Sequence, residues 1–394
     1  MTDSSLIAGW VLAMAVSGPL LFFALEVLCG VRRDPNRVQT CLAPSTCIVI
    51  PAHNEELIIK GTLDKLREEL PDGFKVLVVA DNCTDYTSDL VKQCRFHVIE
   101  RFDDELKGKG YALAYARDWL RKSPPECVII FDADCTTDSG SLTSLALWAV
   151  ASGSVAQARY IFKPDLSVSA KVQISNFALW LKNSVRQRGS RRLGGGAILT
   201  GTGMAFPWDI FADLPLATTS IVEDLTLTVD LARSGRAPIY LDAATVQSFA
   251  ATESATLEQR SRWEQGFLRV AKGHGLPLLY LGMKRLDRKA FLLGLHLLVP
   301  PLALLLTAAM LAIFALLAFA IWADNWMPLL AVTLAFSTAV LSVAFAWLAG
   351  GHHWMRANAV LLLPVYVAWK LPLYLGAALG RTVGWVRTKR DGGT

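Results

Sequence analysis

Charged side chains are scarce in this sequence. Only 19% of its 394 residues are Asp, Glu, Lys or Arg, whereas an ordinary soluble domain contains about 25%. Hydrophobic residues make up 53% of the chain instead, and they concentrate at its two ends. The stretch from Arg32 to Lys289 has an ordinary soluble composition. We therefore expect one soluble domain between membrane-associated ends.

Paired cysteine motifs and long basic tracts are also absent. The seven cysteines form no CxxC pair, which argues against a zinc motif or a disulfide framework and favours reduced thiols in a cytosolic domain. The net charge is +5, but no long Lys/Arg tract with interleaved aromatic residues occurs. Nucleic-acid binding is therefore not expected, and the basic clusters are expected to face a membrane.

The N-terminal apolar run is expected to cross a membrane. Leu6 to Leu28 is apolar except for Glu26 and a few small polar residues, and it is long enough for a hydrocarbon core of about 30 Å. Basic residues follow the run (Arg32, Arg33 and Arg37), whereas a signal peptide carries them in front. We expect an uncleaved anchor whose C-terminal end lies in the cytoplasm.

The C-terminal apolar region is expected to cross the membrane twice. Leu302 to Trp322 and Met327 to Leu348 are long enough to span, and Pro300-Pro301 sets an interfacial approach apart from the first of them. Ala359 to Leu379 contains Lys370, which is costly in lipid, and a crossing there would place the terminal basic residues outside. We expect an interfacial or re-entrant helix, with a fourth crossing as the alternative.

The middle of the chain alternates short Val- and Ile-rich runs with helical stretches. This alternation predicts a parallel sheet covered by helices on both faces. Ligands bind beyond the carboxyl ends of strands in such sheets. The expected strands are 47–50, 75–80, 96–99 and 128–131, and the expected helices are 55–70, 84–93 and 111–120.

Polar clusters follow three of these strands. Residues 51–56 follow the first strand, Asp81 and Asp85 the second, and Asp132 and Asp134 the fourth. A single Asp after a strand is often a helix N-cap, and this interpretation is equally good for Asp81 or Asp85 alone. Asp132 and Asp134, one residue apart on a turn, can share Mg²⁺ or Mn²⁺ and help a diphosphate to leave.

Two further segments carry candidate charges. Lys109 lies between two glycines ahead of a helix, where a lysine can meet a phosphate, although a solvated basic loop explains it equally well. Ser220 and Glu223 have capping-box spacing, and Gly235 is expected to end that helix. Asp224 needs no structural role there, so it is a candidate base for an acceptor hydroxyl.

Two helical segments later in the soluble part have distinctive faces. Gln259, Arg262 and Trp263 share one face of a helix expected from Thr256, suited to a diphosphate and a sugar, or simply to packing on the core. Lys171 to Arg192 combines apolar residues at helical spacing with six basic residues and no acidic one. It is expected to lie on an anionic membrane surface, with a buried helix edge as the alternative.

Taken in order, four motifs resemble the family 2 inverting glycosyltransferases, in particular the membrane-integrated branch. That branch includes cellulose, hyaluronan and chitin-oligosaccharide synthases and, more distantly, ceramide glucosyltransferase. The resemblance covers roughly residues 45 to 270. The family's D, DxD, ED and Q(Q/R)xRW motifs are matched by Asp81, Asp132-Ala133-Asp134, Glu223-Asp224 and Gln259-Arg260-Ser261-Arg262-Trp263.

The resemblance implies a GT-A fold, which is an α/β Rossmann-like mixed sheet covered by helices, and a UDP-sugar donor. It places Asp81 near the uracil, Arg262 and Trp263 at the diphosphate and acceptor, and Thr200 to Gly203 at the acceptor entrance. Asp132 and Asp134 are the expected metal ligands, and Asp224 and Glu223 the expected catalytic pair. The substrate-binding set is Pro51, His53, Glu55, Asp81, Lys109, Asp132, Thr202, Gly203, Gln259, Arg262 and Trp263.

The expected protein is therefore an integral enzyme of a bacterial inner (plasma) membrane with a cytoplasmic catalytic domain. Residues 1–30 form the transmembrane anchor, 31–289 the GT-A domain with interfacial helices, and 290–394 the C-terminal transmembrane and interfacial helices. The acceptor is a growing polysaccharide or oligosaccharide, or alternatively a membrane lipid. The small number of spans favours the lipid, or a homo-oligomer with a channel between subunits. A non-catalytic membrane scaffold is the remaining alternative.

Overall fold

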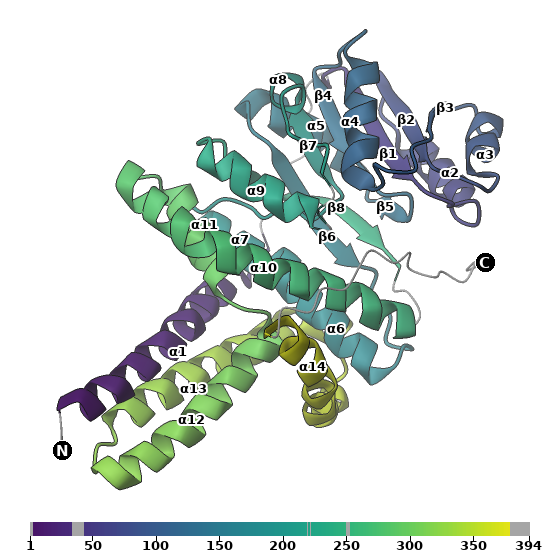
Figure 1. Cartoon of the computed structure of the whole chain (residues 1–394). Coiled ribbons are helices and arrows are strands. Elements are labelled where there is room, and N and C mark those ends of the chain that lie inside the picture. Colours follow the sequence, from purple (N-terminus) through teal and green to yellow (C-terminus); the bar gives the residue numbers. More distant parts are fainter. Residues whose placement is uncertain (1–2, 34–42, 219, 221, 250–252, 379–394) are drawn as a thin grey trace. The chain divides into compact units, whose positions relative to one another are not determined.

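The computed structural model describes residues 3–33, 43–218, 220, 222–249 and 253–378 (Figure 1). These residues form two compact units. Among the described residues, the sheet unit comprises residue 33 and residues 43–163 and 196–256, apart from the gaps just given, and the helix unit comprises residues 3–32, 164–195 and 257–378. The segments 164–195 and 257–289 group with the apolar helices, and the expected domain bounds at residues 30 and 289 stay a prediction.

One half of the sheet unit is parallel, as the sequence predicts. Its strands are β1 (Thr46–Ala52), β2 (Phe74–Asp81), β3 (His97–Arg101) and β4 (Cys127–Ile130). The inner three are buried almost throughout, since both faces are covered, which explains their continuous Val and Ile runs. The connecting helices are α2 (Ile59–Glu69), α3 (Thr87–Gln93) and α4 (Lys109–Leu120).

The other half of the sheet is mixed. Here β7 (Met204–Pro207) runs antiparallel to β4 and to β6 (Ala156–Phe162), β8 (Ile239–Ser248) is parallel to β6, and β5 (Cys135–Thr137) is antiparallel to β8. The full order is β3-β2-β1-β4-β7-β6-β8-β5, and the expected mixed α/β sheet is confirmed. The helices of this half are α5 (Ser141–Ser152), α8 (Trp208–Phe211) and α9 (Glu223–Arg233).

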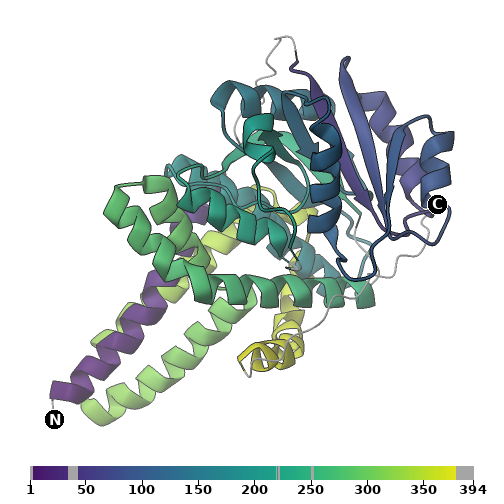
Figure 2. The same cartoon turned by 45° about the horizontal axis from the view of Figure 1, so that its top comes forward.

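The helix unit contains four segments that are long and apolar enough to cross a membrane: Leu6–Gly30, Leu302–Ala323, Met327–Ala349 and Ala357–Tyr374. The first three lie in α1 (Asp3–Gly30), α12 (Leu302–Ala323) and α13 (Met327–Ala349), which run side by side in both views (Figures 1 and 2). The fourth begins with a 3₁₀ turn before α14 (Leu363–Ala378). The end of the expected run, Leu379, lies outside the described residues.

The remaining helices of this unit come from sequence between the N-terminal and C-terminal apolar runs. They are α6 (Ala170–Trp180), a π-helical stretch (Leu181–Arg186), α7 (Gln187–Arg192), α10 (Glu253–Arg285) and α11 (Arg288–Leu298). The helix expected from Thr256 is α10, which begins three residues earlier.

The basic segment from Lys171 to Arg192 is largely buried within the helix unit, which corrects the expectation of a helix lying on a membrane surface. Glycines make the burial possible, because a Cβ atom added at Gly189 would lie 1.8 Å from the Glu26 carbonyl oxygen. The backbones of α1 and α7 therefore touch, and no layer of solvent or lipid separates them.

Two buried charges are satisfied at this crossing. Arg186 Nε donates to Glu26 Oε2 at 2.7 Å, and His296 Nδ1 lies 2.5 Å from Glu26 Oε1. The Glu26 side chain is completely buried. The first apolar run therefore contains a paired charge, which the sequence did not indicate.

Replacing Arg186 with methionine is expected to destabilise the protein by about 3–5 kcal/mol, because the buried Glu26 carboxylate loses its guanidinium partner and keeps only His296. The measurement is the unfolding midpoint in detergent. Arg192→Met is the matched control: its guanidinium also contacts α1, at the Cys29 carbonyl oxygen, but it is exposed. An Arg186 variant as stable as the Arg192 variant would contradict the assignment.

Candidate active site

The loops after β1 and β2 are joined by hydrogen bonds. His53 Nδ1 donates to the Asp81 carbonyl oxygen at 2.7 Å, and the Glu55 amide donates to Thr87 Oγ1 at 2.8 Å. The predicted residues Pro51, His53 and Glu55 therefore lie beside Asp81 at the carboxyl edge of the sheet, as expected for parallel neighbours.

Asp81 and Asp85 have different roles. Asp85 Oδ1 accepts from the Thr87 amide at 3.0 Å and its Oδ2 accepts from the Glu56 amide at 3.1 Å, so Asp85 joins the start of α3 to the loop after β1. Asp81 forms an ion pair with Arg101, with Nη1 to Oδ1 at 2.7 Å, and both side chains are at most 10% exposed. The sequence analysis missed Arg101, although it is the last residue of β3 and stands in register with Asp81, the last residue of β2.

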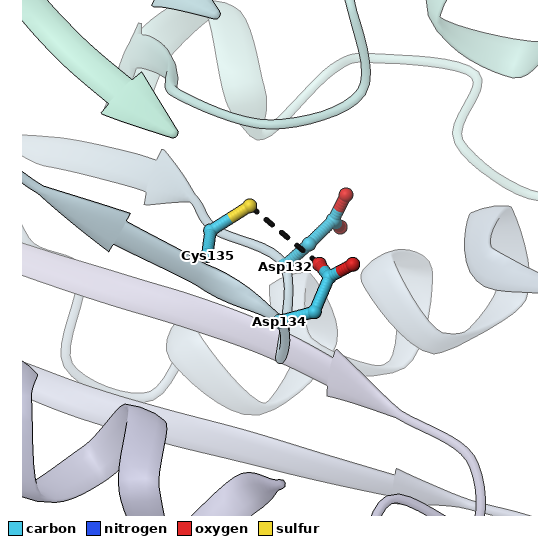
Figure 3. A group of neighbouring side chains, drawn as sticks. All are labelled: Asp132, Asp134 and Cys135. Atoms are coloured by element: carbon cyan, nitrogen blue, oxygen red, sulfur yellow. Dashed lines mark hydrogen bonds between the residues drawn. The ribbon is translucent and has the colours of Figure 1, made fainter. Parts of the chain in front are cut away.

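Asp132, Asp134 and Cys135 form a compact cluster between β4 and β5 (Figure 3). One ligand atom from each residue lies within 4.8 Å of the others. Burial raises the pKa of Cys135 well above its ordinary value, so Cys135 is a thiol, and its Sγ donates to Asp134 Oδ1 at 3.6 Å. The two carboxylates alone therefore offer the hard oxygen ligands that fit Mg²⁺ or Mn²⁺.

Lys109 forms hydrogen bonds both to this cluster and to the loop that contains Gly201. Its Nζ donates to Asp132 Oδ1 at 2.5 Å and to the Gly201 carbonyl oxygen at 2.7 Å. Burial lowers the pKa of Lys109, but three surrounding carboxylates raise it by more, so the net pKa is above its ordinary value. They belong to Asp132, Glu223 and Asp224. Lys109 is therefore an ammonium inside an acidic site, and the solvated-loop alternative is wrong.

Glu223 and Asp224 open α9 at the same place. The distance from Asp224 Oδ2 to the position of a Cβ atom added at Gly201 is 3.5 Å, and the same position lies 3.5 Å from Lys109 Nζ. Burial and the neighbouring Asp224 carboxylate raise the pKa of Glu223 to about 8, although Lys109 lowers it.

The helix start at α9 differs from the expected capping box. The N-cap is Val222, which has no side chain able to cap, and Ser220 Oγ accepts instead from the Val222 amide at 3.4 Å. Glu223 and Asp224 therefore occupy the first helical turn, where the helix dipole favours carboxylates. The expected end is confirmed, since Gly235 has φ 76° just past the last turn.

Thr202, which precedes Gly203, forms hydrogen bonds to the turn that carries Asp132. Thr202 is fully buried, and its Oγ1 accepts from the Asp132 amide at 3.1 Å and donates to Cys135 Sγ at 3.6 Å. The Thr202 hydroxyl is thus engaged within the protein, and its expected place at an acceptor entrance stays a prediction. Gln157, which the sequence analysis missed, clamps the same loop from β6: its Nε2 donates to the Thr202 carbonyl oxygen at 3.0 Å and its Oε1 accepts from the Thr200 amide at 3.0 Å.

The Q(Q/R)xRW segment lies on α10 in the helix unit. Arg260 stacks on Trp263, with its guanidinium carbon 4.9 Å from the ring centroid, and donates to Asn176 Oδ1 of α6 at 3.4 Å. The predicted residues therefore fall into two sets. The sheet unit brings together Lys109, Asp132, Glu223 and Asp224, with Asp134 beside Asp132, whereas Gln259, Arg262 and Trp263 belong to the helix unit.

Comparison with known proteins agrees with this geometry. Residues 47–214 match the family model described as "Glycosyl transferase family 2". The probable glycosyltransferase YdaM of Bacillus subtilis is 26% identical over 238 residues, covering 57% of this chain and 55% of YdaM. The uncharacterized protein MJ1222 of Methanocaldococcus jannaschii is 37% identical over 93 residues, which are 22% of this chain and 34% of MJ1222. The chain thus spans about half or less of the length of these curated relatives.

A solved structure extends the likeness to the whole fold. The mannosyltransferase PcManGT of Pyrobaculum calidifontis, in complex with GDP-Man and Mn²⁺, superposes with a TM-score of 0.54 and 20% identity, over 95% of this chain and 98% of that one. The expected GT-A fold, a mixed sheet with apolar helices added, is therefore confirmed. Asp81, Asp132 and Asp134 all lie within the segment that matches the glycosyl transferase family 2 model.

Proposed function

We propose that this protein is a membrane glycosyltransferase that transfers a sugar from a nucleotide-sugar donor, with inversion, to a glycan acceptor. One observation carries the proposal. The Lys109 ammonium connects the Asp132–Asp134 turn to the loop beside Asp224. The same lysine side chain therefore lies close both to the Asp132–Asp134 pair, which suits a divalent cation, and to Asp224, which suits removal of a proton.

Asp132 and Asp134 are proposed to hold Mg²⁺ or Mn²⁺. Their carboxylates and the absence of a thiolate at Cys135 fit a hard cation, and PcManGT carries Mn²⁺ together with its donor. Such an ion supplies charge neutralisation for a departing diphosphate. Lys109 adds a positive charge at the same place.

Asp224 is proposed as the base that takes the proton from the acceptor hydroxyl. Its place in the first turn of α9 favours the carboxylate form, and the left-handed Gly201 beside it has no side chain to block approach. Glu223, its neighbour, is proposed to act with Asp224 as part of the catalytic pair by influencing the charge of the Asp224 carboxylate. Arg262 and Trp263 on α10 are proposed to contact the leaving diphosphate and the acceptor.

The donor is proposed to be a UDP-sugar. Asp81 is the residue expected near the base, and its Oδ1 is engaged by Arg101. PcManGT was solved in complex with GDP-Man, so UDP-sugars and GDP-sugars are both compared as donors. Pro51, His53 and Glu55 surround the same edge of the sheet and belong to the proposed donor site.

The apolar helices are proposed to anchor the enzyme in a bacterial inner membrane with the sheet unit in the cytoplasm. Large hydrophobic side chains are exposed along α1, α12 and α13, among them Met14, Leu311 and Leu341, as a lipid environment requires. The small number of such helices in the described chain supports a second candidate, single transfer to a membrane lipid, or assembly of several copies around a glycan.

A thermal-shift screen of the purified full chain tests the donor and the cation together. UDP-, GDP- and dTDP-sugars are added with Mg²⁺, with Mn²⁺ or with a chelator. A UDP-sugar with a cation is expected to stabilise the fold by about 2.7 kcal/mol at 100 times its dissociation constant, and the shift is expected to disappear with the chelator. Size analysis of products from radiolabelled donor then separates polymer from glycolipid.

Two results would contradict the proposal. A shift with GDP-sugars alone would replace the donor assignment. No cation-dependent shift with any donor, together with no transfer, would favour a non-catalytic membrane scaffold.

A further inference from the structure

Lys370 is a buried charge that the proposed reaction does not use. It lies in α14, inside a segment that is otherwise apolar enough for a membrane, and its side chain is 1% exposed. A lysine near the end of an apolar helix normally extends its ammonium towards water. Lys370 instead points into the helix unit.

The partner of Lys370 is a carboxylate on α10. Lys370 Nζ donates to Glu264 Oε1 at 2.7 Å, and Tyr374 OH donates to Glu264 Oε2 at 3.1 Å. Lys370 and Tyr374 are one helical turn apart on α14, so they share a face. Both oxygens of Glu264 are thus held from one side by one helix.

Glu264 follows Arg262-Trp263 directly in the sequence. Arg260, one turn before Glu264, stacks on Trp263 and donates to Asn176 of α6. The motif helix is therefore held by polar contacts to α14 through Glu264 and to α6 through Arg260. Because each residue of an α-helix is turned by about 100° from the last, holding these two residues fixes the direction of those between them.

We propose that Lys370 is a positioning residue that sets the rotation of α10, and with it the placement of Arg262 and Trp263, through Glu264. This inference rests on the proposed function, in which Arg262 contacts the leaving diphosphate. It gives α14 a part in sugar transfer besides any role in anchoring. Lys370 itself touches no substrate.

The test compares Lys370→Met, the double variant Lys370→Met/Glu264→Gln, and Leu371→Ala, an exposed neighbour on the same helix, as the control. Lys370→Met is expected to lower kcat by about 100-fold, the scale of a misplaced catalytic group, with the donor KM within threefold. It also leaves a carboxylate uncompensated, so a lower unfolding midpoint is expected. The control is expected to match the unchanged protein in both measurements.

The double variant separates positioning from stability. It removes both charges, so its unfolding midpoint is expected to return to that of the unchanged protein, while kcat stays low because α10 has lost its contact to α14. Recovery of both midpoint and kcat would overturn the proposal, since it would show a structural role alone. Unchanged kcat in Lys370→Met would overturn it as well.

Hydrogen exchange tests the positioning role of Lys370 without an activity measurement. Amides of residues 258–268 in α10 are expected to exchange faster in the double variant than in the control, at equal unfolding midpoints. If the unchanged protein transfers no sugar, the proposed function fails, and exchange still decides whether Lys370 fixes α10. Equal exchange in the two proteins would remove the positioning role.

Discussion

Asp224→Asn is expected to lose sugar transfer by about a thousandfold while still binding the nucleotide. A positioned base contributes about 10²- to 10⁴-fold, and asparagine has nearly the same shape but cannot accept the proton. Asp224 lies beside Gly201 and Lys109, whereas Asp81, the residue proposed to contact the nucleotide base, is paired with Arg101. The donor site should therefore survive the change.

The measurement is steady-state transfer together with the dissociation constant for UDP. Asp230→Asn makes the same chemical change further along α9 and is expected to leave both values unchanged. An Asp224→Asn enzyme with normal turnover would remove the base assignment. Loss of UDP binding to the same extent as transfer would assign Asp224 to the donor site instead.

Asp134→Asn is expected to weaken Mn²⁺ binding by at least about 100-fold, because losing an outer-shell partner alone costs about 10- to 100-fold.

Lys109→Met is expected to strengthen Mn²⁺ binding in the absence of nucleotide. Its ammonium lies 2.5 Å from Asp132 Oδ1 and competes with any cation for that oxygen. The pair is partly exposed, with side chains 23% and 33% accessible, so a gain of about 1 kcal/mol, roughly fivefold, is reasonable.

Manganese binding can be followed by electron paramagnetic resonance, which detects the free ion and needs no turnover. Transfer should stop in a chelator and return with added Mn²⁺. Equal Mn²⁺ affinity in the Asp134 variant and the unchanged protein would show that the ion, if used, is held elsewhere. Weaker binding in Lys109→Met would mean that Lys109 supports the cation and does not compete with it.

The parallel half of the sheet was predictable because its signal is local. Each strand from β1 to β4 contains a short Val/Ile run, and β1, β2 and β3 are each followed by a helix, so burial on both faces follows from the pattern. The mixed half was not predictable in this way. β7 has only four residues, and β5 only three, so neither is long enough to show a period.

The acidic part of the site was predictable for a related reason. Asp81 and the Asp132–Asp134 turn directly follow recognisable strands, and parallel strands bring their carboxyl ends together. Arg101, Gln157 and the Arg186–Glu26 pair were missed because their partners are 20 to 160 residues away. No local pattern marks such contacts. The capping box is the opposite case, a predicted contact that does not form. Ser220 and Glu223 have the right spacing, but α9 begins at Glu223, so Ser220 is not its N-cap.

The crossing of α1 with the π-helical stretch and α7 limits how this protein can be handled. Arg188 is buried, and its Nη1 donates to the Gly30 carbonyl oxygen of α1, while Arg186 depends on Glu26. Deleting α1 to obtain a water-soluble form would leave two guanidinium groups in the protein interior without these acceptors. The first helix is therefore an internal part of the folded protein, and solubilisation should rely on detergent or lipid discs around the intact chain.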